Sequence, residues 1–280
     1  MRTLDAEAQY PEGPLWRDGA LYYVEFAAQR IARWQDGSKS LFWSEPGSGP
    51  CALGAWRNGF LLCAHDANAL VEIDRDGRTV ARLERDRDGN PFVAPNDLTP
   101  DGAGGFFFTA SGVFDVTAPA TGAVLHLESA GSIRRLVDGL HYANGIAFDP
   151  EHRRLFVSEH LAARIMTFDV RGDGSLASPT LFCDLLSVAP HALAREPYAG
   201  DDGIKLDRTG RLLVAHFGTG RLLVLARDGS LDRAIDLPLR WPTNLALDPT
   251  TGAAAVTSVA DPWNAPYGGA VLHLDPDLLA

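Results

Sequence analysis

Six segments of the chain place a small or polar residue at the start of a stretch of alternating apolar residues. In chain order these positions hold Glu12, Ala52, Asn96, Asn144, Asp202 and Thr243. The two carboxylates and two carboxamides offer oxygen ligands, which suit hard divalent cations such as Ca²⁺, Mg²⁺ or Mn²⁺. Ionised carboxylates that lie close together must repel one another or be neutralised. If the fold brings these positions together, they predict a cation site.

The six positions belong to a repeated unit. In each unit an apolar-alternating stretch leads through a turn into a second β-rich run, as Asn144–Asp149 leads into Leu155–Ser158. A third run such as Arg30–Trp34 and then a fourth complete the unit. Four short strands every 40–50 residues or so are typical of propeller blades. We therefore expect an all-β fold, a six-bladed β-propeller of four-stranded antiparallel blades, forming one domain over residues 1–280.

A closed propeller must join its two ends. We expect Leu4–Gln9 to pair with the last blade near Val271–Leu274, because closure removes exposed sheet edges. Two units are longer than the others and carry insertions, near Ser111–Thr121 and near Asp184–Gly200. The second insertion contains Pro190-His191 and could cover one mouth of the channel.

Propeller geometry predicts where the polar positions lie. The first strand of each blade is nearest the axis, so the six positions should form a ring around one mouth. The second strand returns to the same face, and its last residues should form a polar second ring of Glu25, His65, Ala110, Glu159, His216 and Ser258. Together with nearby aromatic residues, this predicts substrate contacts at Asn96, His65, Phe114, Tyr142, His160 and His216.

Structural roles compete with these functional ones. Asn and Asp before a strand often only cap turns, and hydrogen-bonded packing explains His65 and His216 as well as a functional role does. Four aspartates that stand just before Gly-containing turns are expected to be structural: Asp101, Asp149, Asp207 and Asp248. The register of the ring positions across several blades favours a cation site over simple capping.

The sequence resembles the SMP-30/gluconolactonase/luciferin-regenerating-enzyme-like family over essentially its whole length. The motifs that carry the resemblance are Glu12–Trp16, Pro95–Asp97, Ala143–Phe148 and Asp202–Ile204, supported by Val214–Gly218. The resemblance implies one divalent cation near the channel mouth, with Ca²⁺ expected first and Zn²⁺, Mn²⁺ or Mg²⁺ as alternatives. By matching motif, its ligands fall on Glu12, Asn144 and Asp202, with Asn96 as a further ligand or a substrate contact.

The resemblance also implies hydrolysis of small lactones by metal-activated water, and we expect Asp202 to act as general base. Some sugar-lactonase members have an arginine where this chain has Ala94, and the wall near Phe114 and Tyr142 is less polar than a polyol binder needs. Other esters, phosphotriesters, or dehydration or isomerisation of a lactone-like compound are alternatives. A non-catalytic propeller with a structural metal is another, since fold alone does not decide function.

Composition argues against several other classes. The chain has 25 Lys and Arg against 36 Asp and Glu, a net charge of −11, which disfavours nucleic-acid binding. No apolar run approaches the roughly 18–20 residues of a membrane span, and the first residues lack the apolar core of a signal peptide. The three cysteines form no CxxC motif, and no G-x-S-x-G motif occurs. We expect a small-molecule substrate, a monomer or weak homo-oligomer, and a cytoplasmic location.

Overall fold

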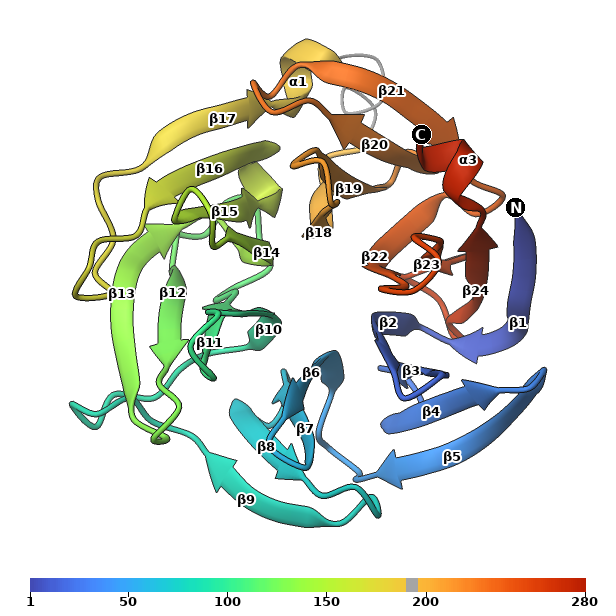
Figure 1. Cartoon of the computed structure of the whole chain (residues 1–280), viewed down its shortest axis with the longest axis horizontal. Helices are drawn as coiled ribbons and strands as arrows, with labels where there is room; N and C mark the ends of the chain where they lie inside the picture. Colours follow the sequence, from blue (N-terminus) through green and yellow to red (C-terminus); the bar gives the residue numbers. More distant parts are fainter. Residues whose placement is uncertain (190–195) are drawn as a thin grey trace.

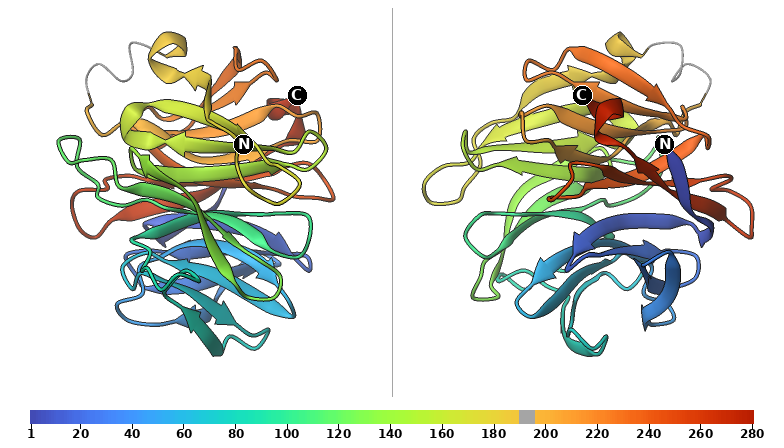
Figure 2. Two further views of the ribbon diagram at one scale, coloured as in Figure 1. Left: turned by 90° about the vertical axis from the view of Figure 1, so that its left-hand side faces the viewer. Right: turned by 45° about the vertical axis from the view of Figure 1, so that its right-hand side comes forward.

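Twenty-four strands form six four-stranded antiparallel sheets in the computed structural model, which describes residues 1–189 and 196–280. The sheets surround a central channel, so the fold is the predicted six-bladed β-propeller (Figure 1). Side views show the sheets as successive layers of strands (Figure 2).

The first three blades follow one another along the chain. Blade 1 consists of β2 (Pro11–Arg17), β3 (Ala20–Glu25), β4 (Arg30–Gln35) and β5 (Ser38–Ser44). Blade 2 consists of β6 (Pro50–Trp56), β7 (Gly59–Ala64), β8 (Ala69–Ile73) and β9 (Thr79–Leu83). Blade 3 consists of β10 (Pro95–Pro100), β11 (Phe106–Ala110), β12 (Gly122–Leu127) and β13 (Ile133–Leu140).

The second half of the chain forms the other blades. Blade 4 consists of β14 (Ala143–Asp149), β15 (Arg154–Glu159), β16 (Arg164–Asp169) and β17 (Thr180–Asp184). Blade 5 consists of β18 (Gly200–Leu206), β19 (Leu212–Phe217), β20 (Arg221–Leu225) and β21 (Leu231–Asp236). Blade 6 consists of β22 (Trp241–Leu247), β23 (Ala254–Val259), β24 (Gly268–Leu274) and β1 (Arg2–Gln9). The short helices described are η1 (His160–Ala162), α1 (Leu185–Val188) and α3 (Pro276–Leu279).

The apolar core lies between adjacent blades. On β7, Leu62 belongs to the same buried cluster as Val24 of blade 1, whereas its neighbour Leu61 belongs to the same cluster as Phe108 of blade 3. Successive residues of a strand point to opposite faces, so a strand buried on both faces is apolar throughout. Because the apolar side chains are used between the blades, the ends of the inner strands are free to carry polar groups toward the channel.

The predicted closure is confirmed. Strand β1 pairs antiparallel with β24, with Thr3 opposite Leu272. A clasp of three charged residues crosses the seam between blades 6 and 1: the half-buried Lys39 ammonium lies 2.7 Å from the buried Asp5 and 2.9 Å from the buried Glu25. The N-terminal and C-terminal ends of the chain lie near each other in Figure 1.

The two predicted insertions connect strands at the channel mouth where the inner strands begin. Residues 111–121 join β11 to β12, and α1 lies in the insertion that follows β17. The Pro190-His191 pair lies outside the described residues. The four turn aspartates are structural as predicted; Asp101, for example, accepts the backbone N–H groups of Ala103 and Gly105.

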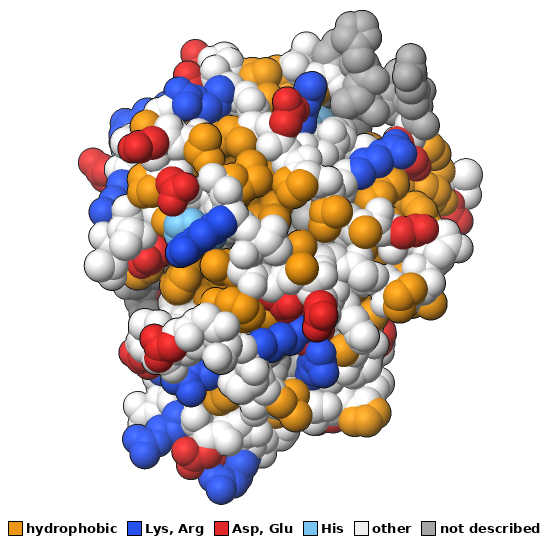
Figure 3. Space-filling model, turned by 90° about the vertical axis from the view of Figure 1, so that its right-hand side faces the viewer, with side chains coloured by type: hydrophobic (Ala, Val, Ile, Leu, Met, Phe, Trp, Pro, Cys, Tyr) orange, Lys and Arg blue, Asp and Glu red, His pale blue; other side chains and the backbone are white. Residues whose placement is uncertain are grey.

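The remaining fold features concern surface and composition. Among the described residues, no helix has the length and apolar character needed to cross a membrane. The cysteines Cys51, Cys63 and Cys183 are buried free thiols. Acidic and basic side chains are interspersed on the face that Figure 3 shows, without a continuous basic patch.

Candidate functional site

A cavity of about 450 Å³ opens at the mouth where the inner strands begin. Four of its lining residues are Glu12 on β2, Asn96 on β10, Asn144 on β14 and Asp202 on β18. Each is less than one tenth exposed. The structure therefore brings the four predicted cation ligands, from four different blades, to the floor of one cavity.

Local backbone geometry aims these side chains. Every inner strand has a register irregularity near its start, for example between Glu12 and Leu15 and between Ala143 and Ile146. A β-bulge adds a residue on one strand and re-aims the side chains beside it. The six-fold repetition of the irregularity explains why sequence-equivalent positions reach the same mouth.

Glycine allows the inner strands to approach closely. Gly13, Gly145 and Gly203 directly follow the three ligands predicted from blades 1, 4 and 5. A Cβ on Gly145 would lie 2.2 Å from the carbonyl oxygen of Asp202 on the neighbouring strand. A larger residue there would push apart the two strands that carry Asn144 and Asp202.

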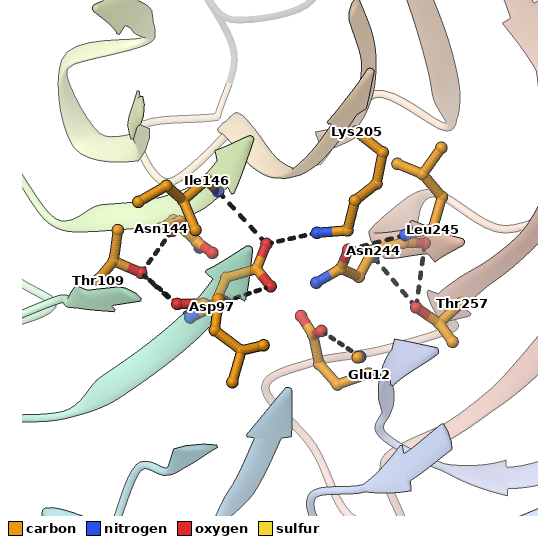
Figure 4. Close-up of polar contacts among 11 residues, drawn as sticks. Glu12, Asp97, Thr109, Asn144, Ile146, Lys205, Asn244, Leu245 and Thr257 are labelled. Carbon is orange, nitrogen blue, oxygen red and sulfur yellow. Dashed lines mark hydrogen bonds and ion pairs between the residues drawn. The ribbon is translucent and has the colours of Figure 1, made fainter. Parts of the chain in front are cut away.

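A charged layer lies beneath the floor. The Lys205 ammonium lies 2.8 Å from the Asp97 carboxylate, and Figure 4 shows Glu12 and Asn244 pointing toward the same part of the channel. Asp97 and Asn244 hold equivalent places in the opposite blades 3 and 6, and each accepts the backbone N–H of the next residue at 2.8 Å. Sequence reasoning missed this layer, although Lys205 is one of only two lysines in the chain.

The floor carboxylates lie in an unfavourable environment. Burial raises the pKa of Glu12 and the Asp97 charge raises it further, while the Gly13 N–H, 2.7 Å away, lowers it. Burial also raises the pKa of Asp202 well above its ordinary value, and the nearby Glu12 charge adds to this. Desolvation and like charge both disfavour the ionised forms, so a bound cation would offset both effects.

A short hydrogen-bonded chain orients Asn144. The His160 Nε2 lies 3.0 Å from the Tyr198 carbonyl oxygen, which can only accept, so Nε2 carries the hydrogen in the neutral ring. Burial lowers the pKa of His160 to about 4, which keeps the ring neutral. The His160 Nδ1 then accepts from the Asn144 Nδ2 at 3.4 Å. The Asn144 Oδ1 is buried and has no partner among the described residues.

The donor set fits a hard divalent cation. Buried polar atoms are nearly always paired, so the unpartnered Asn144 Oδ1 beside two buried carboxylates points to a missing partner. Within the described residues, no group of three or more His, Cys, Asp or Glu side chains could hold a metal. A cation at this floor would therefore depend on asparagine oxygens as well as on Glu12 and Asp202, an all-oxygen set that suits Ca²⁺.

The predicted substrate contacts divide into two groups. His65, Phe114, Tyr142 and His160 line the cavity together with Asn96. The structure does not bring His216 into the lining; its ring is fully buried, and neither ring nitrogen has a partner among the described residues. The reason is the alternation of β19, which directs the next residue, Phe217, into the cavity instead.

The glutamates of the predicted second ring have a structural role, which corrects that expectation. The lining does not include Glu25 or Glu159. The Glu25 carboxylate accepts the backbone N–H of Gln9 at 2.9 Å and pairs with Arg30. Glu159 repeats this arrangement in blade 4 with the N–H of His141 and with Arg164. These glutamates fasten the chain just before an inner strand.

Sequence reasoning missed several aromatic lining residues: Tyr10, Phe26, Phe217, Trp263 and Tyr267. A signal existed for Tyr10, because it stands directly before an inner strand as Tyr142 does. Both have left-handed backbone, with φ of 50° and 58°, a conformation that non-glycine residues seldom adopt. Trp263 lies in the β23–β24 loop, between the second and third strands of blade 6, and no residue pattern of the repeat marked it.

Comparison with known proteins places this site in context. The family model for the SMP-30/Gluconolactonase/LRE-like region matches residues 10–260. The chain belongs to this family. An L-arabinolactonase of Azospirillum brasilense is 27% identical over 241 residues, which cover 85% of this chain and 77% of that protein.

Two solved structures have a similar fold. The first, described as a gluconolactonase of Xanthomonas campestris, has a TM-score of 0.80 and 25% identity, covering 98% of this chain and 88% of that chain. The second, described as a calcium-binding protein, regucalcin, of Agrobacterium tumefaciens, has a TM-score of 0.80 and 20% identity, covering 98% of this chain and 92% of that chain. The second comparison shows the shared fold, and its calcium belongs to that protein.

Proposed function

We propose that this protein is a divalent-metal-dependent hydrolase that opens a small lactone. The observation that carries the proposal is the convergence of Glu12, Asn144 and Asp202 on one cavity floor, with the Asn144 Oδ1 left without a partner. Membership of a family that includes lactonases supports the reaction class. Glu12, Asn144 and Asp202 would hold the cation, with Asn96 beside it, and Ca²⁺ is the first candidate.

The residues of the cavity floor have different roles in the proposed hydrolysis. A divalent cation bound at this floor supplies Lewis-acid stabilisation of the negative charge that develops on the lactone carbonyl oxygen. Asp202 accepts the proton of the attacking water, because its carboxylate lines the cavity and is shielded from bulk solvent. Asn96 orients the substrate, while Glu12 and Asn144 hold the cation. His160 keeps the Asn144 oxygen turned toward the floor.

Asp202→Asn tests the proposal. General base catalysis contributes about 10²–10⁴-fold, so kcat should fall by that factor while the melting temperature changes little. Asp236→Asn is the matched control, because this carboxylate lies on β21 of the same blade with its side chain 85% exposed. Lactone hydrolysis by Asp202→Asn at the wild-type rate would remove Asp202 from the mechanism.

A substrate and metal screen separates the proposal from its alternatives. The full chain is assayed on lactones, aryl esters and phosphotriesters with Ca²⁺, Mn²⁺, Mg²⁺, Zn²⁺ or EDTA. Metal-dependent lactone opening supports the hydrolase. Turnover confined to esters or phosphotriesters would support the alternative substrates of the same site. A cation that raises the melting temperature without any turnover would instead support a non-catalytic, metal-stabilised propeller.

A further inference from the structure

The wall of the cavity is aromatic above its polar floor. Seven aromatic residues line it: Tyr10, Phe26, Phe114, Tyr142, Phe217, Trp263 and Tyr267. The volume of about 450 Å³ lies within the roughly 300–1,000 Å³ range of pockets that hold drug-sized ligands. The cavity thus offers more apolar surface and more room than one small polyhydroxylated ring would need.

The aromatic side chains meet across the channel mouth. Phe114 lies in the β11–β12 loop of blade 3, and Trp263 lies in the β23–β24 loop of blade 6, on the opposite side of the channel (Figure 1). Their rings are stacked, with centroids 6.3 Å apart and an interplanar angle of 20°. Tyr142 of blade 4 lies 4.7 Å from the Phe114 ring. An aromatic ring entering the cavity would therefore meet the Phe114, Trp263 and Tyr142 side chains at its mouth.

Most polar groups of the wall are already engaged. The Gln29 Nε2 donates to the Phe26 carbonyl at 2.9 Å, and its Oε1 accepts the Gly49 N–H at 2.8 Å. The two His65 ring nitrogens face Asp66 at 3.0 Å and the Tyr142 hydroxyl at 3.4 Å. A polyol bound here would therefore find few free partners for its hydroxyl groups, apart from the floor itself and tyrosine hydroxyls.

The charge of the lining also selects among ligands. Glu12 and Asp202 are acidic, and the described lining residues include no arginine or lysine. A bound divalent cation would offset these two charges, and phosphate, sulfonate or carboxylate substituents on a substrate would find no cationic side chain among the described lining residues to pair with. The cavity therefore favours a neutral ligand.

We propose that the substrate is a neutral lactone carrying an aromatic ring, an inference that rests on the proposed lactonase function. The aromatic ring packs against Phe114, Trp263 and Tyr142 while the ester group reaches the floor. Water forms the new acyl C–O bond, and the ring acyl C–O bond breaks. The proton that Asp202 accepts is returned to the leaving alkoxide oxygen, so that the product is a hydroxy acid.

Matched lactones test this substrate class. 3-Isochromanone is a benzo-fused δ-lactone, and like δ-valerolactone it releases an alkoxide. D-glucono-δ-lactone is the polyhydroxylated comparison substrate. Each kcat/KM is divided by the uncatalysed hydrolysis rate of the same lactone, which corrects for differences in intrinsic reactivity. We expect kcat/KM for 3-isochromanone to exceed that for D-glucono-δ-lactone by about 100-fold, the effect of leaving two of the four hydroxyls unpaired at about tenfold each. Equal or better hydrolysis of D-glucono-δ-lactone would overturn the aromatic class and leave the lactonase proposal intact.

Variants connect that preference to the aromatic wall. Phe114→Ala and Trp263→Ala should each lower kcat/KM for 3-isochromanone about tenfold, because stacking and apolar contact are lost. The value for δ-valerolactone should fall less, so that each variant lowers the ratio of the 3-isochromanone value to the δ-valerolactone value. Trp263 is 47% exposed, so its variant should fold. Val113→Ala is the matched control, since Val113 is 52% exposed in the same loop as Phe114 and is not part of the lining. An unchanged preference in both aromatic variants would overturn the proposal.

A binding measurement separates this inference from the proposed function. The benzo-fused δ-lactam corresponding to 3-isochromanone and D-glucono-δ-lactam are titrated calorimetrically into wild-type protein and the Phe114→Ala variant. Tighter binding of the benzo-fused lactam, weakened about tenfold by Phe114→Ala, supports an aromatic binding site. If no lactone is hydrolysed in that case, only the proposed hydrolase function is overturned. Equal binding of the two lactams, or no effect of Phe114→Ala, would overturn the aromatic site.

Discussion

Gly145→Ala tests whether the close approach of two inner strands sets the candidate cation site. Strand β14 carries Asn144 beside this glycine, and β18 carries Asp202. The added Cβ would lie 2.2 Å from the Asp202 carbonyl oxygen and 2.6 Å from the Ile204 nitrogen. Both contacts are with backbone atoms, which cannot rotate away as the end of a flexible side chain could. The two strands must therefore move apart.

The structure gives the size of this effect. The 2.2 Å contact falls about 1.2 Å short of the 3.4 Å at which ordinary van der Waals contact begins. Overpacking of this kind costs about 1–3 kcal/mol of stability. A misplacement of about 1 Å between catalytic groups costs on the order of 10²-fold in rate. We expect a loss of stability in that range, weaker Ca²⁺ binding and a fall of about 100-fold in kcat/KM.

Three measurements on one variant separate these effects: urea denaturation, calorimetric titration with Ca²⁺, and hydrolysis of a lactone identified by the screen. Gly172→Ala is the matched control, because its added Cβ would have no neighbour within 4 Å and its φ is not in the left-handed region. The control should retain wild-type stability and activity. Wild-type Ca²⁺ affinity and turnover in Gly145→Ala would refute the argument that strand separation sets the site.

Three further perturbations probe other parts of the structure. Lys39→Met should lower the free energy of unfolding by about 2–3 kcal/mol in urea, because it leaves two buried carboxylates at the seam without their shared partner; an unchanged midpoint would argue against a clasp. Burial raises the pKa of Asp86, but backbone N–H groups and Arg135 outweigh it and lower the pKa overall. This carboxylate therefore stabilises the fold above about pH 4 and loses its effect as pH falls through the lowered folded-state pKa. Asp86→Asn should accordingly destabilise more at pH 6 than at pH 3, and equal losses at both pH values would contradict this. His160→Phe should weaken Ca²⁺ binding about 10–100-fold in calorimetry by releasing the Asn144 amide, with little change in melting temperature; unaltered affinity would exclude the orienting role.

Internal repetition made the fold and the candidate cation ligands predictable. Each unit repeats the same strand order, so equivalent positions such as Glu12, Asn144 and Asp202 had to be related by the rotation of the propeller. Closure by β1 followed from the need to remove free sheet edges. These are consequences of pattern and symmetry, which a single sequence displays directly.

Tertiary structure decided the features that break this symmetry. His216 and Phe217 are neighbours in sequence, and the direction of the pleat in β19 determined that Phe217 lines the cavity. Trp263 reaches the mouth only because its loop stands opposite the loop of Phe114. The Asp97–Lys205 pair joins residues 108 positions apart.

The repeat in the sequence therefore determined the fold and the ring of candidate oxygen ligands that the fold brings together. The aromatic wall, the pairing of charges beneath the floor and the orientation of Asn144 were decided by the folded structure. The physical reason is that these features depend on side-chain direction and on loops from different blades. Such contacts leave no periodic trace in the sequence.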